Sequence, residues 1–271
     1  MTAPLIVERR RAGLMWLEAT GPGWRLAFST RLGGVSNGAF ESLHLSLSTD
    51  DEAAAVLANR ERLAAALGIR PSDLVVPGQV HGVRVREVDD GQRGRGATSP
   101  QTVLAGTDGL LTRAPDLPLM VSTADCVPVF LAAEGSDGRP AIALVHAGWR
   151  GMLAGVLISA AAALSRLGRL TTAVVGPSIG PCCFEVGDDV GSALEARFPG
   201  VWRDGRADLW ACAAQELATA GLPAAAVANP RLCTVCDRRF FSHRRDGGRT
   251  GRQAALAWIP APAGRPETER G

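Results

Sequence analysis

Three residues in the sequence could together bind a catalytic metal ion: His81 in GQVHG, Cys126 in TADCVP and His146 in VHAGWRG. Each lies at the end of an apolar, strand-like run and beside a turn, where α/β proteins commonly place functional side chains. Two imidazoles and a thiolate would give zinc three protein ligands and leave a fourth position open for water or substrate. The alternative is that both histidines are hydrogen-bonded turn residues and the cysteine is a small buried hydrophobe, and the spacing alone favours this alternative.

The residue types that are missing exclude several other mechanisms. All 29 basic residues are Arg, and the chain contains neither Lys nor Tyr. Without an amine there can be no Walker A phosphate loop, no pyridoxal Schiff base and no Ser-Lys hydrolase. The four histidines are His44, His81, His146 and His243, so any imidazole-based mechanism must draw on these.

The elements that must position these residues form a mixed pattern of strands and helices. Strands are predicted near 24–30, 74–76, 83–88, 118–126, 127–133, 141–148, 172–180 and 254–260. Helices are predicted after a cap at Thr49 or Asp50 and ending at Gly68, and at 151–168, 187–197 and 207–220. Strands and helices do not alternate regularly, so the pattern favours an α+β fold, a mixed sheet layered with helices.

Composition indicates one globular domain over residues 1–260, with a tail at 261–271 that is expected to be disordered. The 271 residues are 46% hydrophobic and 21% charged, with a net charge of +2 that is too balanced for a general polyanion binder. The charge-free stretch at 151–165 is too short to cross a bilayer, and charges interrupt the N-terminal apolar run early. We therefore expect a cytoplasmic protein that binds neither nucleic acid nor membrane, with a monomer favoured over an oligomer.

The longer motifs favour the interpretation of His81, Cys126 and His146 as metal ligands. GQVHG, TADCVP, HAGWRG, GPSIGPCCFEVG and LCTVCDRRFFSHRRDGGRTGRQ, with TRLGGVSNGAFESLHLSLSTDDE near the N-terminus, resemble the multicopper polyphenol oxidase (laccase-domain) family. Members of that family are now regarded as purine nucleoside phosphorylases with adenosine deaminase activity. The resemblance spans about residues 24–259. It implies an α+β fold with a mixed β-sandwich covered by helices, and a metal site at His81, Cys126 and His146.

The older family name implies copper, which the histidine count can test. A multicopper oxidase with a blue site and a trinuclear cluster needs roughly ten histidines, and the blue site alone takes two His and one Cys. Four histidines cannot supply that set. Zinc is therefore the expected metal, and copper-dependent phenol oxidation is at most a side reaction of a single bound copper.

Further candidates surround the predicted site. Arg150 in HAGWRG, Arg31 in TRLGG and Arg244 in FFSHRRDGG lie near glycines and could bind phosphate or border the substrate, although a helix start or a solvated turn would explain each. Asp125, next to Cys126, could orient a ligand imidazole, donate a proton to a purine nitrogen or only cap a turn. His44 is predicted to be a strand residue.

The remaining cysteines and two aromatic residues have weaker signals. Cys233 and Cys236 form one CxxC, which suggests a structural zinc or a redox pair but has no evident fourth ligand. The adjacent Cys182 and Cys183 are expected only to pack. The two aromatic residues, Trp149 and Phe184, could stack on a base, although core packing explains both.

Three classes of function follow. The first is a zinc-dependent phosphorylase that converts adenosine, inosine or methylthioadenosine and phosphate to the base and ribose 1-phosphate, with slower deamination of adenosine. The zinc deaminase signature H-x-E with P-C-x-x-C is absent around His146, so deamination needs a different acid and base. The second class is a metal-free hydrolase with Cys126 as nucleophile and a histidine as base. The third is a non-catalytic, metal-stabilised binding protein.

Overall fold

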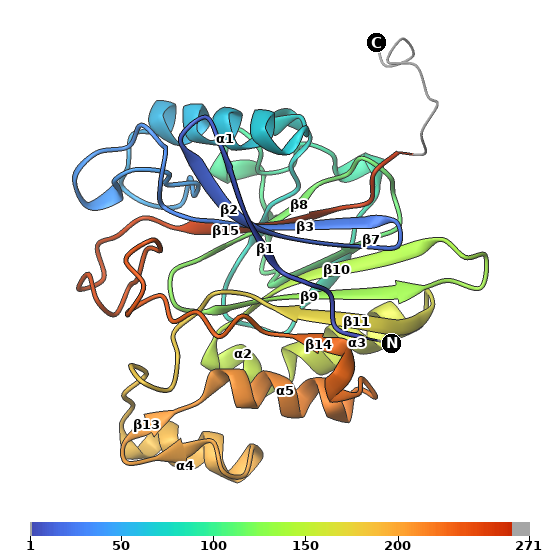
Figure 1. Ribbon diagram of the computed structural model, residues 1–271, viewed down its shortest axis with the longest axis vertical. Helices are drawn as coiled ribbons and strands as arrows, with labels where there is room; N and C mark the ends of the chain where they lie inside the picture. The colour runs from blue at the N-terminus through green and yellow to red at the C-terminus, as the bar shows by residue number, and fades with distance from the viewer. Residues whose placement is uncertain (1, 262–271) are drawn as a thin grey trace.

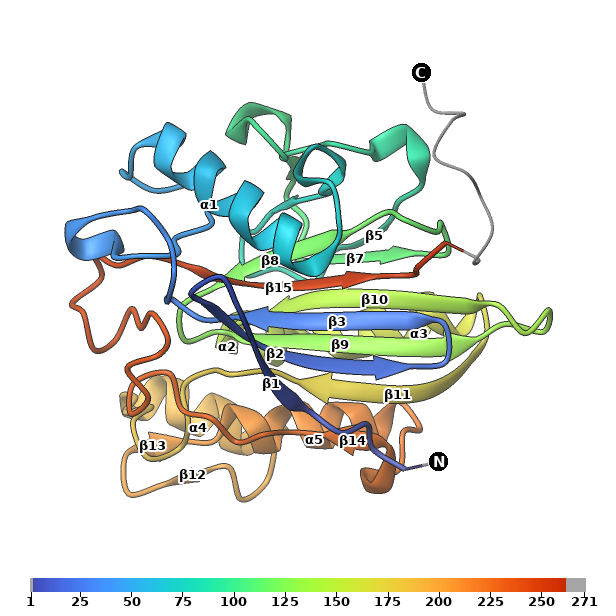
Figure 2. The same cartoon turned by 45° about the horizontal axis from the view of Figure 1, so that its top comes forward.

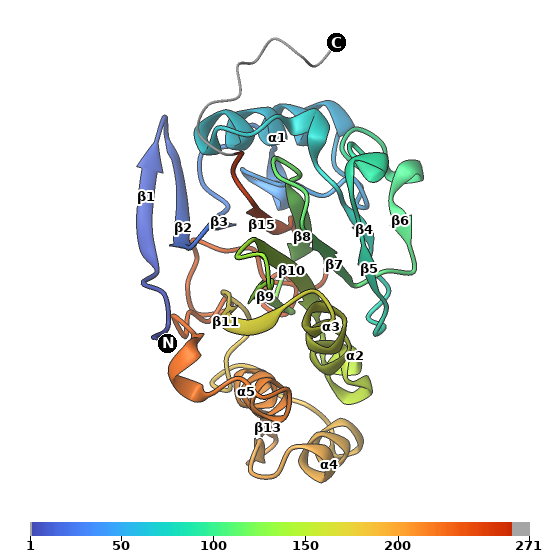
Figure 3. The same cartoon turned by 90° about the vertical axis from the view of Figure 1, so that its right-hand side faces the viewer.

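The computed structural model describes residues 2–261 and contains two β-sheets packed face to face, with helices over both outer faces (Figures 1 and 3). In Figure 2 the long strands of the two sheets run in roughly the same direction, as in an aligned β-sandwich. The predicted α+β class, a mixed β-sandwich layered with helices, is confirmed. The assignment of 1–260 to one domain stays a prediction, and 262–271 of the predicted tail lie outside the described residues.

The first sheet is antiparallel throughout. It consists, in spatial order, of β1 (Val7–Arg11), β2 (Leu14–Gly21), β3 (Trp24–Ser29), β15 (Gln253–Trp258) and β8 (Leu119–Thr123). The hairpin of β1 and β2 was not predicted from the sequence. β1 is an edge strand whose residues are mostly exposed, so its run of charged side chains carries no alternation that would mark it as a strand.

The second sheet is mixed. It consists, in spatial order, of β14 (Val227–Ala228), β11 (Arg169–Val175), β9 (Val127–Glu134), β10 (Pro140–Ala147), β7 (Gly109–Thr112) and β5 (Val85–Glu87). The outer pairs β5–β7 and β11–β14 are parallel, and the inner pairs are antiparallel. Two short ladders join β4 (Pro77–Gly78) to β6 (Leu104–Ala105) and β12 (Trp202–Arg203) to β13 (Arg206–Ala207).

Apolar side chains fill three layers around the two sheets. Phe130 and Ala132 of β9 belong to the layer between the sheets, whereas Val129 and Leu131 belong to the layer beneath the helices. Successive side chains of a strand point to opposite faces, so a strand covered on both faces is apolar throughout. This is why the central strands could be recognised as unbroken apolar runs.

Helix α1 (Ala53–Leu67) covers the five-stranded sheet, and α2 (Trp149–Ala154), α3 (Val156–Ser165) and α5 (Leu209–Thr219) cover the six-stranded one, with α4 (Asp188–Arg197) farther out (Figure 3). α1 ends at Gly68 as predicted, but it begins after Glu52 instead of Thr49 or Asp50. The remaining helices are 3-10 turns: Gly38–Phe40, Pro71–Asp73, Asp90–Gln92, Pro100–Thr102 and Ala224–Ala226.

The single helix predicted at 151–168 is in fact two helices, α2 and α3. Gly155 separates them with a φ of 88°, a left-handed conformation that glycine adopts without strain. Within residues 2–261, none of the helices has both the length and the apolar character needed to span a membrane.

Candidate metal centre and its cavity

The register of two neighbouring strands brings Cys126 and His146 together. β9 and β10 pair so that His146 lies opposite Pro128 and Ala147 opposite Val127. Cys126 directly precedes β9, and His146 is the penultimate residue of β10. The start of one antiparallel strand therefore lies beside the end of the other, and both residues lie at the same edge of the sheet.

A buried carboxylate that the sequence did not single out positions both histidines. Asp108, with no solvent exposure, accepts hydrogen bonds from the backbone N–H groups of His81 (2.9 Å) and Gly82 (2.7 Å), and Val80 N–H also donates to it. Its Oδ1 lies 2.9 Å from His146 Nδ1. In the sequence, Asp108 in GTDG is indistinguishable from an ordinary turn residue.

The three predicted ligands do converge. One ligand atom from each of His81, Cys126 and His146 can be chosen so that all lie within 4.8 Å of one another. Cys126 Sγ is 3.7 Å from His81 Nε2, and the two imidazole rings are edge to face with centroids 4.8 Å apart. A Cβ at Gly148 would lie 2.7 Å from His81 Cδ2 and 3.2 Å from Cys126 Sγ, so the cluster requires glycine there.

Strain and charge are both concentrated at this cluster. His81 and Asp125 have φ values of 61° and 86°, which side-chain-bearing residues rarely adopt. Burial alone would raise the pKa of Cys126, but the charge of His146 and hydrogen bonds from both histidines lower it to about 6. Burial alone would lower the pKa of His146, but the Cys126 thiolate and Asp108 raise it to about 9. Without metal, the pair is therefore thiolate and imidazolium near neutral pH.

The donor set fits a metal ion. It combines two imidazoles with a thiolate, and the carboxylate on His146 Nδ1 leaves Nε2 of that ring free to act as a ligand, which is a common outer-shell arrangement in metal sites. His81 is exposed, Cys126 half-buried and His146 buried, so the cluster is open on one side. His81, Cys126 and His146 therefore form a site that can bind a metal ion, and this chemistry suits zinc or copper.

The cluster opens into a cavity of 560 Å³, a size suited to a small organic ligand. Two of the three predicted substrate-binding arginines, Arg150 and Arg244, line it. Arg31 does not: its guanidinium donates to the carbonyl of Glu41 and lies over the Phe241 ring. Arg60 and Arg252 also line the cavity and were not predicted from the sequence. Arg252 lies in the same quoted motif as Arg244, but only the fold shows that it borders the cavity.

The carboxylate of Asp125 stabilises turns. Its Oδ1 accepts a 2.6 Å hydrogen bond from Thr234 Oγ1, and its Oδ2 accepts one of 2.6 Å from the Arg244 backbone N–H. Of the roles considered for Asp125, these contacts match the turn-capping one, and it is Asp108 that contacts the ligand imidazole of His146. Asp125 instead fixes the turn that carries Arg244 at the cavity wall.

His44 is not the strand residue that was expected. It lies in a buried irregular segment, where Nε2 is 2.6 Å from Thr49 Oγ1 and Nδ1 accepts a 2.8 Å hydrogen bond from Arg252 N–H. Burial lowers its pKa to about 4, so the ring is neutral. His44 thereby fixes two residues of the cavity wall, Thr49 and Arg252.

The expectation that Cys182 and Cys183 only pack, and that the CxxC lacks further ligands, is also wrong. The structure brings both residues against Cys233 and Cys236, forming a second cluster of four potential metal ligands.

The fold and the site define a β-sandwich protein in which a His-Cys-His cluster that can hold a metal ion opens into an arginine-lined cavity. The chain belongs to the multi-copper polyphenol oxidoreductase laccase family, whose model matches residues 25–260. The resemblance noted in the sequence is thereby confirmed.

The names of several relatives state an enzymatic activity. The purine nucleoside phosphorylase Rv2149c of Mycobacterium tuberculosis is 41% identical over 244 residues, covering 87% of this chain and 92% of the relative. Adenosine deaminase RL5, from an unknown prokaryotic organism, is 35% identical over 241 residues, covering 83% and 90%. The crystal structure of YlmD from Geobacillus stearothermophilus superposes with a TM-score of 0.85 at 34% identity, covering 94% of this chain and all of that one.

Proposed function

We propose that the protein is a zinc-dependent purine nucleoside phosphorylase with a slower adenosine deaminase activity. The observation that carries the proposal is the opening of the His81, Cys126 and His146 cluster into a cavity lined by several arginines. The names of the relatives support the substrate class. The cavity combines what this chemistry requires: cationic groups for phosphate, aromatic rings for a base and a ligand set for a metal.

In phosphorolysis, a phosphate oxygen forms a bond to C1′ of the ribose as the bond from C1′ to the purine nitrogen breaks. The purine leaves with the electron pair and takes up a proton. The role of the chain is to hold the anion against the sugar and to stabilise charge. Arg150 and Arg244 are suited to the phosphate, because both are exposed and both line the cavity. Arg31 is not part of this proposal.

The base would bind beside the aromatic side chains of the cavity. Trp149 and Phe184 both line it, and both also contact the apolar layer beneath the helices. Their rings offer stacking surfaces for a purine, so the two alternatives weighed for these residues, base stacking and core packing, are compatible. Arg150 and Arg244 lie over the Trp149 and Phe184 rings, at 4.3 and 5.5 Å from the centroids, and link the base and phosphate regions.

His81, Cys126 and His146 would hold the zinc, and Asp108 would orient His146. When bound, zinc supplies a Lewis acid that polarises oxygen atoms and lowers the pKa of water. In deamination, the oxygen of water becomes bonded to C6 of adenosine and ammonia leaves, giving inosine. Copper at the same ligands would support phenol oxidation only as a side reaction, since a multinuclear copper centre needs more histidines than the chain contains.

One contact also favours a second candidate, a metal-free thiol hydrolase. Cys126 Sγ lies 3.7 Å from His81 Nε2, and the lowered pKa of Cys126, about 6, is typical of an activated nucleophile. Alkylation of Cys126 that abolishes activity in protein without metal would favour this function over the phosphorylase.

The test is chromatography of adenosine incubated with zinc-loaded protein, with and without phosphate. We expect adenine and ribose 1-phosphate only when phosphate is present, and slower formation of inosine in both cases. His81→Ala is the control, and equal turnover by this variant would identify a contaminating enzyme. Absence of both adenine and inosine would refute the proposal.

A further inference from the structure

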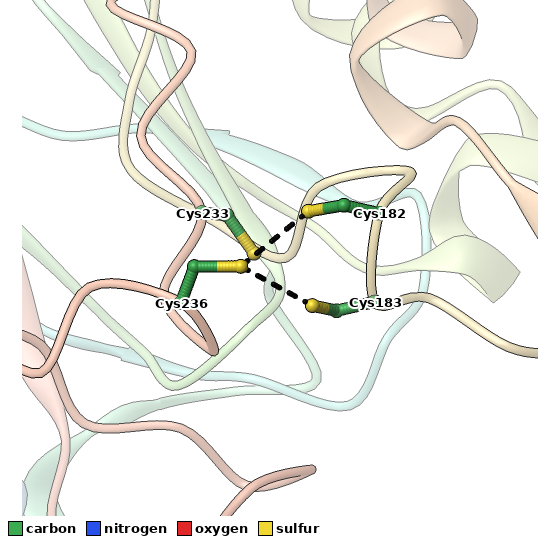
Figure 4. Close-up of side chains that lie close together, drawn as sticks. All are labelled: Cys182, Cys183, Cys233 and Cys236. Atoms are coloured by element: carbon green, nitrogen blue, oxygen red, sulfur yellow. Dashed lines mark hydrogen bonds between the residues drawn. The ribbon is translucent and has the colours of Figure 1, made fainter.

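A second cluster of metal-ligand residues lies outside the cavity just described. One ligand atom from each of Cys182, Cys183, Cys233 and Cys236 lies within 4.8 Å of the others (Figure 4). Cys236 Sγ is 3.6 Å from Cys182 Sγ and 3.4 Å from Cys183 Sγ. The four sulfurs come from two turns about fifty residues apart in the chain, so the fold, and not local sequence, brings them together.

The separations fit a shared ion better than a disulfide. All four thiols are free, and the sulfur separations of 3.4 and 3.6 Å far exceed the bond length of about 2.05 Å. A tetrahedron of thiolates around zinc, with bonds of about 2.3 Å, places its sulfurs about 3.8 Å apart. Two of the sulfur pairs lie at nearly that spacing, and all four sulfurs lie within 4.8 Å of one another.

Backbone contacts fix the two turns against each other. Gly180 N–H donates to Cys233 Sγ at 3.3 Å, which favours a sulfur that carries negative charge. Ser178 N–H donates to the Leu232 carbonyl, and Thr234 N–H donates to the Ser178 carbonyl. Main-chain contacts thus fix the two turns that carry the cysteines, as a preorganised metal site requires.

Arginines beside the cluster offset part of the charge of such a centre. Four thiolates around a divalent ion leave a net negative charge, and Arg231 and Arg238 line the surface hollow that also contains Cys182, Cys233 and Cys236. Arg239 lies there as well, but it is paired with Asp237 and Glu8. Cys182 and Cys236 are exposed, so an ion could reach the cluster from solvent without unfolding.

We propose that Cys182, Cys183, Cys233 and Cys236 bind one structural zinc ion, separate from the metal of the catalytic cavity. Four sulfur ligands in tetrahedral geometry select zinc or iron-sulfur centres, and a closed set of four protein ligands is the arrangement of structural zinc. This proposal does not depend on the proposed enzymatic activity.

A zinc ion at this site would cross-link two turns that contact the segment carrying Cys126. Thr234, next to Cys233, donates to Asp125, and Ile179 N–H donates 2.9 Å to the Asp125 carbonyl. Asp125 precedes Cys126, the thiolate of the first cluster. Joining the two turns through an ion would therefore restrain the segment from which Cys126 projects, and would stabilise the fold by closing a long loop.

The experiment is elemental analysis of full-length protein purified under reducing conditions without chelator, together with the Cys182→Ser and Cys236→Ser variants. Both substituted residues are exposed, so folding should tolerate the change, and circular dichroism checks it. We expect about one equivalent of zinc less than wild type in each variant. Cys212→Ala, which removes a buried cysteine outside both clusters, is the matched control and should keep the wild-type content.

Two further measurements exclude the alternatives. Cys126→Ala should keep the zinc that Cys236→Ser loses, and the double variant should lose both. Mass spectrometry of a second preparation, purified and analysed without reductant, should find no disulfide among the four cysteines. Unchanged zinc in both serine variants, a disulfide in freshly purified protein, or iron in place of zinc would each overturn the proposal.

Discussion

The two cysteine-containing clusters use the same kind of side chain in opposite ways. At the cavity, one thiol and two imidazoles project from strand ends and the adjacent turn, and the set is open on one side. At the surface, four thiols project from two turns and leave no position for a fifth group. An ion held by three ligands can still bind substrate, whereas an ion held by four can only cross-link. The number of ligands and the elements that carry them thus distinguish the proposed catalytic centre from the proposed structural zinc site.

The largest effect that distinguishes the clusters should be on turnover. Cys126→Ala removes the only thiolate of the cavity cluster, and we expect adenosine phosphorolysis to fall by roughly 10³-fold or more. Cys236→Ser should change turnover by less than about threefold, since Cys236 does not line the catalytic cavity. Initial rates with saturating phosphate measure both. Losses of similar size in the two variants would mean that the clusters do not have separate functions.

The next effect concerns the carboxylate behind the cavity cluster. Asp108→Asn removes the charge that holds His146 and weakens the contacts to the 80–82 turn. Loss of such an outer-shell partner typically lowers metal affinity by about 10–100-fold. Competition with a chelator measures this affinity for the cavity metal, and the metal of the four-cysteine cluster should be unaffected. Unchanged affinity would show that Asp108 serves only the fold.

A smaller effect is expected at the cavity wall. Arg150→Ala should raise the apparent KM for phosphate about tenfold, and that for nucleoside much less, because a charged hydrogen bond to the anion is lost. Steady-state kinetics with each substrate varied in turn provide the measurement. Arg86→Ala, an exposed arginine on β5, is the control. Unchanged phosphate dependence in the Arg150 variant would move the anion site to Arg244, the other exposed arginine of the cavity wall.

The smallest effect is a change of rate with pH in metal-stripped protein. Because the pKa of Cys126 is lowered to about 6, its alkylation by iodoacetamide should stay near its plateau at pH 7 and fall to about half near pH 6, as the thiol gains its proton. Peptide mapping by mass spectrometry separates Cys126 from the other cysteines. A midpoint near that of an ordinary thiol would show that His146 does not stabilise the thiolate.

Much of the fold was predictable because its central strands are buried on both faces. Unbroken apolar runs such as 127–133 and 141–148 marked β9 and β10, and Gly68 marked the end of α1. The strand β1 was missed because an edge strand can be charged along its length. The break between α2 and α3 was missed because an isolated glycine within an apolar helical run is often tolerated.

The ligands of the cavity cluster were predictable for a similar reason: His81, Cys126 and His146 each adjoin a recognisable strand and turn. Asp108 was not, because its role depends on burial against another segment. Nor was the approach of Cys182 and Cys183 to the CxxC, which depends on the pairing of two distant turns around Ser178 and Cys233. Sequence reasoning therefore found the groups that local context marks and missed those that only tertiary contacts define.

The geometry of the cavity cluster also depends on the register in which β9 pairs with β10. His146 shares a strand face with Leu144 and Ile142, which point into the space between the sheets. A hairpin that slipped by one residue while folding would turn His146 toward the helices, because side chains alternate along a strand. Such a chain could keep most of its hydrogen bonds, yet it could not offer His146 to an ion with Cys126. Binding of a metal ion by His146 together with Cys126 would thus require the native register of this hairpin.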